Sequence, residues 1–180
     1  MIETFRLHQL LRETVSAPYR CLVTRPTGAA IRSRIEEALA DSACVTALLD
    51  FAEVEVIDFS CADEVVAKLV LAQHTSSGPY VVLQGLTEPQ LEAVEHVLNH
   101  RRLAVAALRE QPARPALLGC ADDDTRQAFT TLCEDGATDP DSLARRIGWS
   151  RERAAAALEM LTSLRLAHFL DGTIRPVPVP

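Results

Sequence analysis

The sequence predicts an α/β protein, a layered α/β domain followed by a smaller domain of helices and a hairpin. Short apolar runs alternate with helix-like patterns as far as residue 118, and this alternation is typical of strands and helices in layers. The last sixty residues lack that alternation. Hydrophobic residues make up 48% of the chain and aromatic residues only 4%, which predicts a core built mainly from aliphatic side chains.

The first elements are expected before residue 58. Tyr19–Thr24 reads as a strand, and Ala29–Ala40 as an amphipathic helix, because its apolar residues fall on one face. Val45–Leu49 and Val54–Ile57 follow as short apolar strands. The turn between the first strand and the helix is marked by Pro26 to Gly28.

A helix is predicted to begin at Ser60. The apolar residues after Ser60 have the spacing of one helix face: Ala62, Val65, Val66, Leu69 and Val70. Ser60 and Asp63 match the S-x-x-[DE] capping pattern, so Ser60 is the predicted N-cap. The helix is expected to end at Ser76–Gly78.

Three further strands and a helix complete the first domain. Thr87 and Gln90 form a capping box that opens a helix from Glu88 to about Arg102. The expected strands are Tyr80–Leu83, Val105–Leu108 and Ala116–Leu118. Gln111–Pro115 is the expected loop, and Gly119–Asp123 the expected boundary, which gives domains 1–119 and 120–180.

The second domain is predicted to contain three helices and a hairpin. Thr125–Glu134 reads as a helix, and Asp139 caps a short helix that starts at Pro140 and ends at Arg146. Ser150 caps a longer helix that ends at Leu164. Asp171-Gly172 is a hairpin turn signal between two short strands.

Charge and cysteine content limit the classes of function. The net charge of −7 disfavours a protein that binds nucleic acid over its whole surface. No apolar run is long enough to span a membrane, and the start of the chain lacks the apolar segment of a signal peptide. The five cysteines never form a CxxC pair, which favours a reducing cytoplasm over disulfides or zinc.

One segment resembles a known family. Leu48 to Leu69, LLDFAEVEVIDFSCADEVVAKL, looks like the signature of STAS domains, the fold of anti-sigma-factor antagonists. Val23 to Leu39, VTRPTGAAIRSRIEEAL, resembles the STAS-like branch more specifically. The resemblance spans roughly residues 20 to 118. Two residues depart from the pattern, namely Phe59, where antagonists have the first serine of a pair, and Cys61.

A second resemblance covers about residues 124 to 178. The phrase LARRIGWSRERAAAALEMLTSLRLAHFLDGTIRPV is similar to the winged-helix domains of bacterial transcription regulators. The expected order of helix, helix, turn, helix and hairpin is the order of that fold. This resemblance implies a helix-turn-helix that contacts duplex DNA.

Ser60 is the first candidate site residue. It falls on the position that matches the phosphorylated serine of the antagonists, so the resemblance implies a phospho-acceptor, while the cap explains the same residue without any modification. The neighbouring acids Asp58, Asp63 and Glu64 would repel a phosphate on Ser60, and together these four residues form the expected partner-docking loop.

Four arginines are the candidate DNA ligands. Arg145 and Arg146 precede the second helix of the motif and are expected to reach phosphates, whereas Arg151 and Arg153 start that helix and could enter a groove. A solvated polar helix face explains the same residues, and winged helices also bind proteins.

The sequence therefore predicts a cytoplasmic bacterial transcription regulator with a sensing or docking domain and a DNA-contacting winged helix. The alternative is a protein-interaction switch of the anti-sigma-antagonist type, which binds a partner kinase or anti-sigma factor and no DNA. No catalytic motif appears, so we expect no enzyme, metal or cofactor. We expect no membrane partner, and the chain can form a homodimer.

Overall fold

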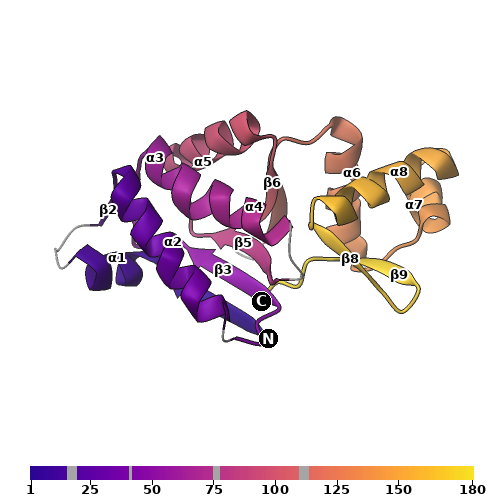
Figure 1. Cartoon of the computed structure of the whole chain (residues 1–180). Coiled ribbons are helices and arrows are strands. Elements are labelled where there is room, and N and C mark those ends of the chain that lie inside the picture. The colour runs from indigo at the N-terminus through magenta and orange to yellow at the C-terminus, as the bar shows by residue number, and fades with distance from the viewer. Residues whose placement is uncertain (16–19, 41, 75–77, 110–113) are drawn as a thin grey trace.

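The α/β class is confirmed by a computed structural model that describes residues 1–15, 20–40, 42–74, 78–109 and 114–180. A central sheet separates one layer of helices from a group of three helices and a hairpin (Figure 1). Within the described residues, no helix has the length and apolar character that crossing a bilayer requires.

Five strands form the central sheet. Their order is β1 (Ile2–Arg6), β3 (Thr46–Asp50), β5 (Tyr80–Gln84), β6 (Ala104–Arg109) and β7 (Arg114–Gly119). The first four strands are parallel, and β7 pairs with β6 in the antiparallel sense. The parallel strands thus lie in the sheet in the same order as in the chain.

The first predicted strand is present but shorter than predicted, and it lies outside the central sheet. The sheet begins at β1, a segment to which the sequence analysis gave no element, because this edge strand buries only Phe5 and shows little apolar alternation. Within Tyr19–Thr24, the described strand is only β2 (Cys21–Leu22), which pairs with β4 (Val56–Ile57) in a separate two-stranded sheet.

All helices of the first part cover one face of the sheet. These helices are α1 (Leu7–Val15), α2 (Arg25–Ala40), α3 (Phe59–Ala62), η1 (Asp63–Ala67, a π-helical turn), α4 (Lys68–His74) and α5 (Glu88–Arg101). Crossovers between parallel strands are nearly always right-handed. Because each new parallel strand is added on the same side of the previous one, every crossover passes over the same face of the sheet. One core cluster joins these helices to the sheet, with Ile31, Ile35, Leu49, Leu69 and Leu83 fully buried.

The end of the chain covers the other face. Here lie α6 (Asp123–Asp135), α7 (Pro140–Ile147), α8 (Arg151–Ser163) and the hairpin of β8 (Ala167–Leu170) and β9 (Thr173–Pro176) (Figure 1). A second core cluster unites the opposite side of the sheet, including Leu48, Val82, Ala106 and Leu117, with residues of this group such as Phe129 and Leu158.

The C-terminal tail also joins the sheet. The hydroxyl of Thr46 donates a hydrogen bond of 2.9 Å to the carbonyl oxygen of Pro178. The amide of Val177 donates one of 3.0 Å to the carbonyl oxygen of Leu166. Thr46 is paired in register with Ile2, so both ends of the chain meet at one end of the sheet (Figure 1).

Most local expectations are confirmed. The capping box of Thr87 and Gln90 is present, and Asp139 and Ser150 cap α7 and α8 as predicted. The strand-helix pattern from residue 29 to 108 agrees, and the hairpin turns at Asp171-Gly172. The turn expected at Pro26 to Gly28 was wrong, because α2 already begins at Arg25. Arg114 and Pro115 belong to β7 and not to a loop, because β7 pairs with β6 along its whole length. Gln111 to Ala113, Ser76 and Ser77 lie outside the described residues.

The boundary between 1–119 and 120–180 stays a prediction. The second core cluster bears on it, since the two parts share apolar surface across the sheet. We therefore expect the fragment 1–119 to expose Leu48, Val82, Ala106 and Leu117 and to self-associate, because an apolar patch of this kind is unstable in water.

Dye binding and sedimentation of the fragment alone check this expectation. The fragment should bind a hydrophobic dye strongly, and added 120–180 should suppress both dye binding and association. A monomeric fragment that unfolds cooperatively and binds no dye would show that the second face needs no cover.

Candidate functional site

Asp58 organises the start of the helix that the STAS resemblance singles out. Its backbone is extended, with φ −87° and ψ 164°, and its Oδ1 accepts hydrogen bonds from the Cys61 amide at 2.7 Å and the Ser60 hydroxyl at 2.8 Å. Its Oδ2 accepts a bond from the Thr24 amide at 2.8 Å. Asp58 is therefore the N-cap, and it ties α3 to the turn before α2.

The prediction that Ser60 caps the helix was wrong. The helix begins at Phe59, which places Ser60 inside the first turn, where its hydroxyl donates to the cap residue. A carboxylate offers two strong acceptor oxygens, so Asp58 can serve three donors at once. Burial raises the pKa of Asp58, but the hydrogen bonds from Thr24, Cys61 and Ser60 outweigh burial and leave the pKa below its ordinary value.

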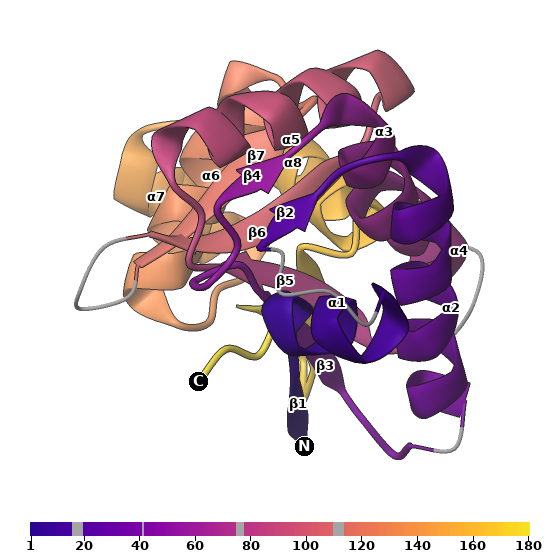
Figure 2. The same cartoon turned by 90° about the vertical axis from the view of Figure 1, so that its left-hand side faces the viewer.

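Phe59 is an exposed aromatic residue at this helix start. Phe59 is 57% exposed, and the centre of its ring lies 4.7 Å from the centre of the His96 ring on α5. Beside it is a hollow of about 460 Å³, lined in part by Phe59, Pro89, Glu92, Ala93 and His96. We call these five residues the Phe59 face. Figure 2 shows α3 beside α5, with the β2–β4 pair next to them.

The other two residues of the expected docking loop, Asp63 and Glu64, are buried. Arg101 of α5 donates to both oxygens of Asp63, at 2.8 and 2.9 Å. Arg25 of α2 donates to Asp63 at 3.0 Å and to Glu64 at 2.8 Å. Three cations thus surround Glu64, because Lys68 donates to it and Arg32 lies 3.5 Å away.

These ion pairs hold three helices together. Burial raises the pKa of Asp63 and of Glu64, but the bonds from the surrounding cations outweigh burial, so both pKa values lie below their ordinary range. The helices also approach closely, since a Cβ atom on Gly28 would lie 2.9 Å from the Cβ atom of Glu64. Asp63 and Glu64 are therefore covered by their partners, whereas Phe59 is open to solvent and Ser60 is half-buried.

The four candidate DNA ligands lie on α7 and α8. Arg151 contacts Asp141 at 3.0 Å, and Arg153 makes a bidentate pair with Asp124 at 2.6 and 2.7 Å. The Arg153 guanidinium also lies 4.3 Å from the ring centre of Trp149. Arg146 approaches Asp135 and Glu134 at 3.7 and 3.8 Å, and Arg145 donates to the Ser142 hydroxyl at 3.2 Å.

Three of these four arginines are therefore paired with acids of the same chain. The pairs are solvent-exposed, and such pairs are weak enough for a phosphate to compete with the carboxylate. Residues 120 to 180 nevertheless contain ten acidic against seven basic residues, and Glu152 stands between Arg151 and Arg153. The net field of this part of the chain does not favour a polyanion.

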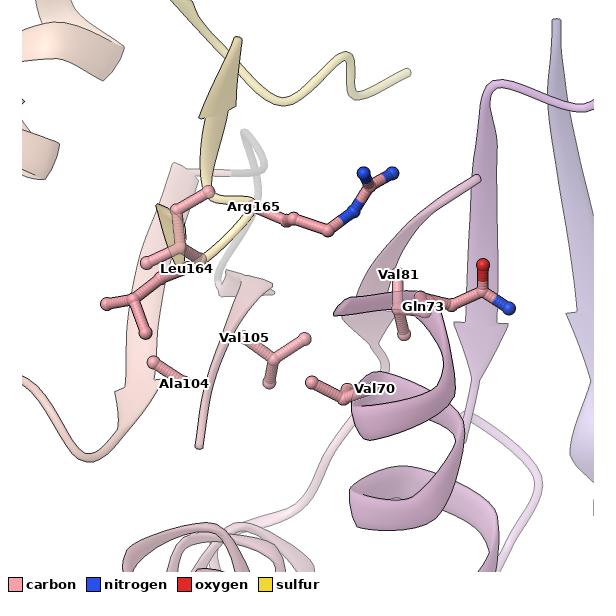
Figure 3. Close-up of a pocket in the computed structure, with 8 residues that line it drawn as sticks. Val70, Gln73, Val81, Ala104, Val105, Leu164 and Arg165 are labelled. Carbon is pink, nitrogen blue, oxygen red and sulfur yellow. The ribbon is translucent and has the colours of Figure 1, made fainter. Parts of the chain in front are cut away.

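Arg165 joins the two parts of the molecule, a role that the sequence analysis did not assign. Its guanidinium lies 4.6 Å from the ring centre of Tyr80, and it donates to the carbonyl oxygen of Gly78. Figure 3 shows its side chain reaching toward Gln73 across a small pocket that Val81 and Val105 also line. The pocket has a volume of about 10 Å³, which is the size of one water molecule, so it is a packing feature.

The sequence also gave no role to Phe59 and His96 as a pair. The sequence carried no signal for this pair, because Phe59 has the helix spacing of Ala62, Val66 and Val70 and would be expected to be buried with them. In the described part of the chain, no group of three or more His, Cys, Asp or Glu residues could hold a metal ion.

Comparisons with protein-family models, with curated proteins and with solved structures find no match to this chain.

The ion pairs of Asp63 predict a loss of stability in acid. Because the pKa of folded Asp63 lies below the unfolded value of about 3.9, its contribution is complete above about pH 5 and is lost as the pH falls through the folded pKa. Asp63→Asn should lower the free energy of unfolding at pH 7 by about 1–3 kcal/mol, since the arginines lose a charged acceptor.

Urea unfolding of wild type and variant at pH 7 and at pH 3 measures this difference, which should shrink at pH 3. Asp124→Asn is the matched control, since it removes the acid of an exposed pair and should change stability little at either pH. A deficit for Asp63→Asn that persists unchanged at pH 3 would mean that the carboxylate charge does not stabilise the helices.

Proposed function

We propose that this chain is a cytoplasmic regulatory protein that acts by binding a protein partner on the Phe59 face. The observation that carries the proposal is the exposure of Phe59 beside a hollow that the apolar residues Ile57, Pro89 and Ala93 help to line. Val56, three residues earlier, is 50% exposed, which adds a second apolar group on the same segment. Exposed aromatic groups next to a pocket are typical anchors of protein interfaces.

Ser60 provides a means of control. Its hydroxyl now donates to Asp58, and a phosphate would remove that donor and add nearly two negative charges beside the cap carboxylate. The resulting repulsion would displace the first turn of α3, which carries Phe59. The resemblance to anti-sigma-factor antagonists supports this arrangement, with a kinase or an anti-sigma factor as the partner class. The role is one of binding, without catalysis.

Removal of the Phe59 ring tests the docking face. Phe59→Ala should weaken retention of partners that co-purify with the wild-type chain from its host, whereas Phe169→Ala should not. Phe169 is the matched control, because it is 70% exposed and lies on the hairpin. Ser60→Asp should weaken the same complexes more than Ser60→Ala does. Equal retention by Phe59→Ala and wild type would remove the Phe59 face from the interface.

Duplex DNA is the second candidate partner, and one observation favours it. Thr138, between α6 and α7, forms a bridge with Ile174 of the hairpin, so the order is helix, bridge, helix, helix, hairpin. That order supports the resemblance to winged helices, and Arg145 is exposed at the end of α7. The paired arginines and the acidic balance rank this function second. A homodimer would double the basic contacts.

Salt dependence distinguishes the two candidates. If the C-terminal helices contact phosphates, replacing Arg145 and Arg146 by Ala should weaken binding to every DNA fragment and reduce the salt slope by about one unit per lost contact. Replacing Arg12 and Arg20 by Ala makes the same charge change elsewhere and should have little effect. The absence of binding to host promoter fragments at low salt would leave the protein partner as the single proposal.

A further inference from the structure

We infer that two copies of this chain associate through β1, with the two β1 strands paired antiparallel about a two-fold axis at Thr4. This contact is separate from the Phe59 face and goes beyond the docking function. β1 and β7 lie at opposite borders of the five-stranded sheet (Figure 2). A border strand has backbone N–H and C=O groups that no neighbouring strand uses, and these groups can pair with a strand of another chain.

The open side of β1 carries the backbone groups of every second residue. The carbonyl oxygen of Met1 accepts the amide of Val45 at 2.8 Å, so it faces β3. Successive residues of a strand direct their backbone groups to opposite sides, which places those of Ile2, Thr4 and Arg6 on the open side. Within the described part of the chain, no hydrogen bond from outside the strand reaches Ile2 or Thr4, and both residues are exposed.

The opposite border of the sheet is closed by a side chain. Arg126 of α6 donates to the carbonyl oxygen of Leu117 at 3.0 Å and to that of Gly119, and both acceptors belong to β7. Among the described residues, no side chain covers the backbone of β1 in this way. The sequence of β1, IETFR, also lacks the proline and glycine that interrupt strand pairing. The border of the sheet at β1 is therefore the one that is free to pair.

A second β1 strand matches these groups when the two-fold axis passes through Thr4. The two Thr4 residues then exchange a pair of N–H···O=C bonds, as opposite residues of an antiparallel ladder do. The amide of each Arg6 meets the carbonyl oxygen of Ile2 of the partner subunit. Arg6 directly precedes α1, so its own carbonyl oxygen accepts the first bond of that helix and is not needed in the ladder.

The side chains select this register over its neighbours. Pairing about Thr4 sets Ile2 opposite Arg6, whose aliphatic stem can cover an apolar side chain, and sets Glu3 opposite Phe5. A shift by one residue in one direction, to an axis at Glu3, would place two Glu3 side chains opposite each other, and opposed like charges destabilise a sheet. A shift to an axis at Phe5 would set Ile2 opposite His8, which belongs to α1 and offers no strand.

The dimer has one continuous sheet with two different faces. A two-fold axis perpendicular to the sheet returns each face to itself, so the contact is the same patch on both subunits. The helices α1 to α5 of both subunits then cover one face, and both groups of α6, α7, α8 and the hairpin lie on the other. A partner that binds the C-terminal group therefore meets two copies on one side of the dimer, which strengthens its binding through multivalency.

Sedimentation equilibrium of the full chain over a range of protein concentrations tests the association. The mass of the wild type should rise from that of one chain to that of two. Thr4→Pro removes the amide at the axis from both subunits and should weaken association by about tenfold or more. The monomer should tolerate this proline, because the lost amide points away from β3. Thr4→Val is the matched control, since it keeps the amide and a β-branched side chain and should dimerise as the wild type does.

Amide hydrogen exchange of the wild type locates the contact without any variant, and it decides alone if Thr4→Pro does not fold. The amides of Thr4 and Arg6 should exchange slowly in concentrated solution and faster on dilution, whereas the amide of Phe5, which faces β3, should stay slow throughout. A wild type that is monomeric at every concentration would overturn the proposal. Exchange at Thr4 that ignores dilution, or a folded Thr4→Pro that dimerises as the wild type does, would also overturn it.

Discussion

Four parallel strands that follow the order of the chain place every connecting helix on one face of the sheet, and the rest of the structure depends on that constraint. The strands are apolar on both sides, with Leu49 and Leu83 facing one core and Leu48 and Val82 facing the other. The first 119 residues supply cover for one side only. The three helices and the hairpin at the end of the chain complete the fold by burying the second side, and the tail is bonded to Thr46.

The surface that we propose as functional depends on a second set of contacts. Asp63 and Glu64 of η1 are buried charges, and cations from α2, α4 and α5 neutralise them. A buried charge is unfavourable unless it is paired. A shift of the flanking helices would leave Asp63 or Glu64 buried without a partner, which would strongly destabilise the fold. This rigid frame holds Asp58, Ser60 and Phe59 at one end. A change at Ser60 would thus act on a short first turn attached to a fixed helix.

Features that depend on neighbouring residues in the chain could be predicted from the sequence. The capping box at Thr87 and Gln90 and the caps at Asp139 and Ser150 are decided within four residues. The start of α3 illustrates the limit, because both Ser60 and Asp58 fit a local capping pattern and the structure has Asp58 as the cap. Asp58 also accepts a bond from Thr24, thirty-four residues earlier, which the local pattern does not contain. Of the candidate site, the segment was found, but the exposure of Phe59 and the pairing of Asp63 with Arg25 and Arg101 arise from distant segments.

The candidate arginines show the same limit from another side. Sequence clustering indicated a basic surface at Arg145 to Arg153, yet Asp124 and Asp141 fold back onto Arg153 and Arg151. The one-sided winding of the sheet also has a consequence for synthesis. Residues 1–119 emerge from the ribosome first, so the apolar second face is exposed to water while the last sixty residues are synthesised. At about 5–20 residues per second this exposure lasts for seconds. We therefore expect nascent chains of this protein to be clients of chaperones that shield apolar surface until residues 120–180 have emerged.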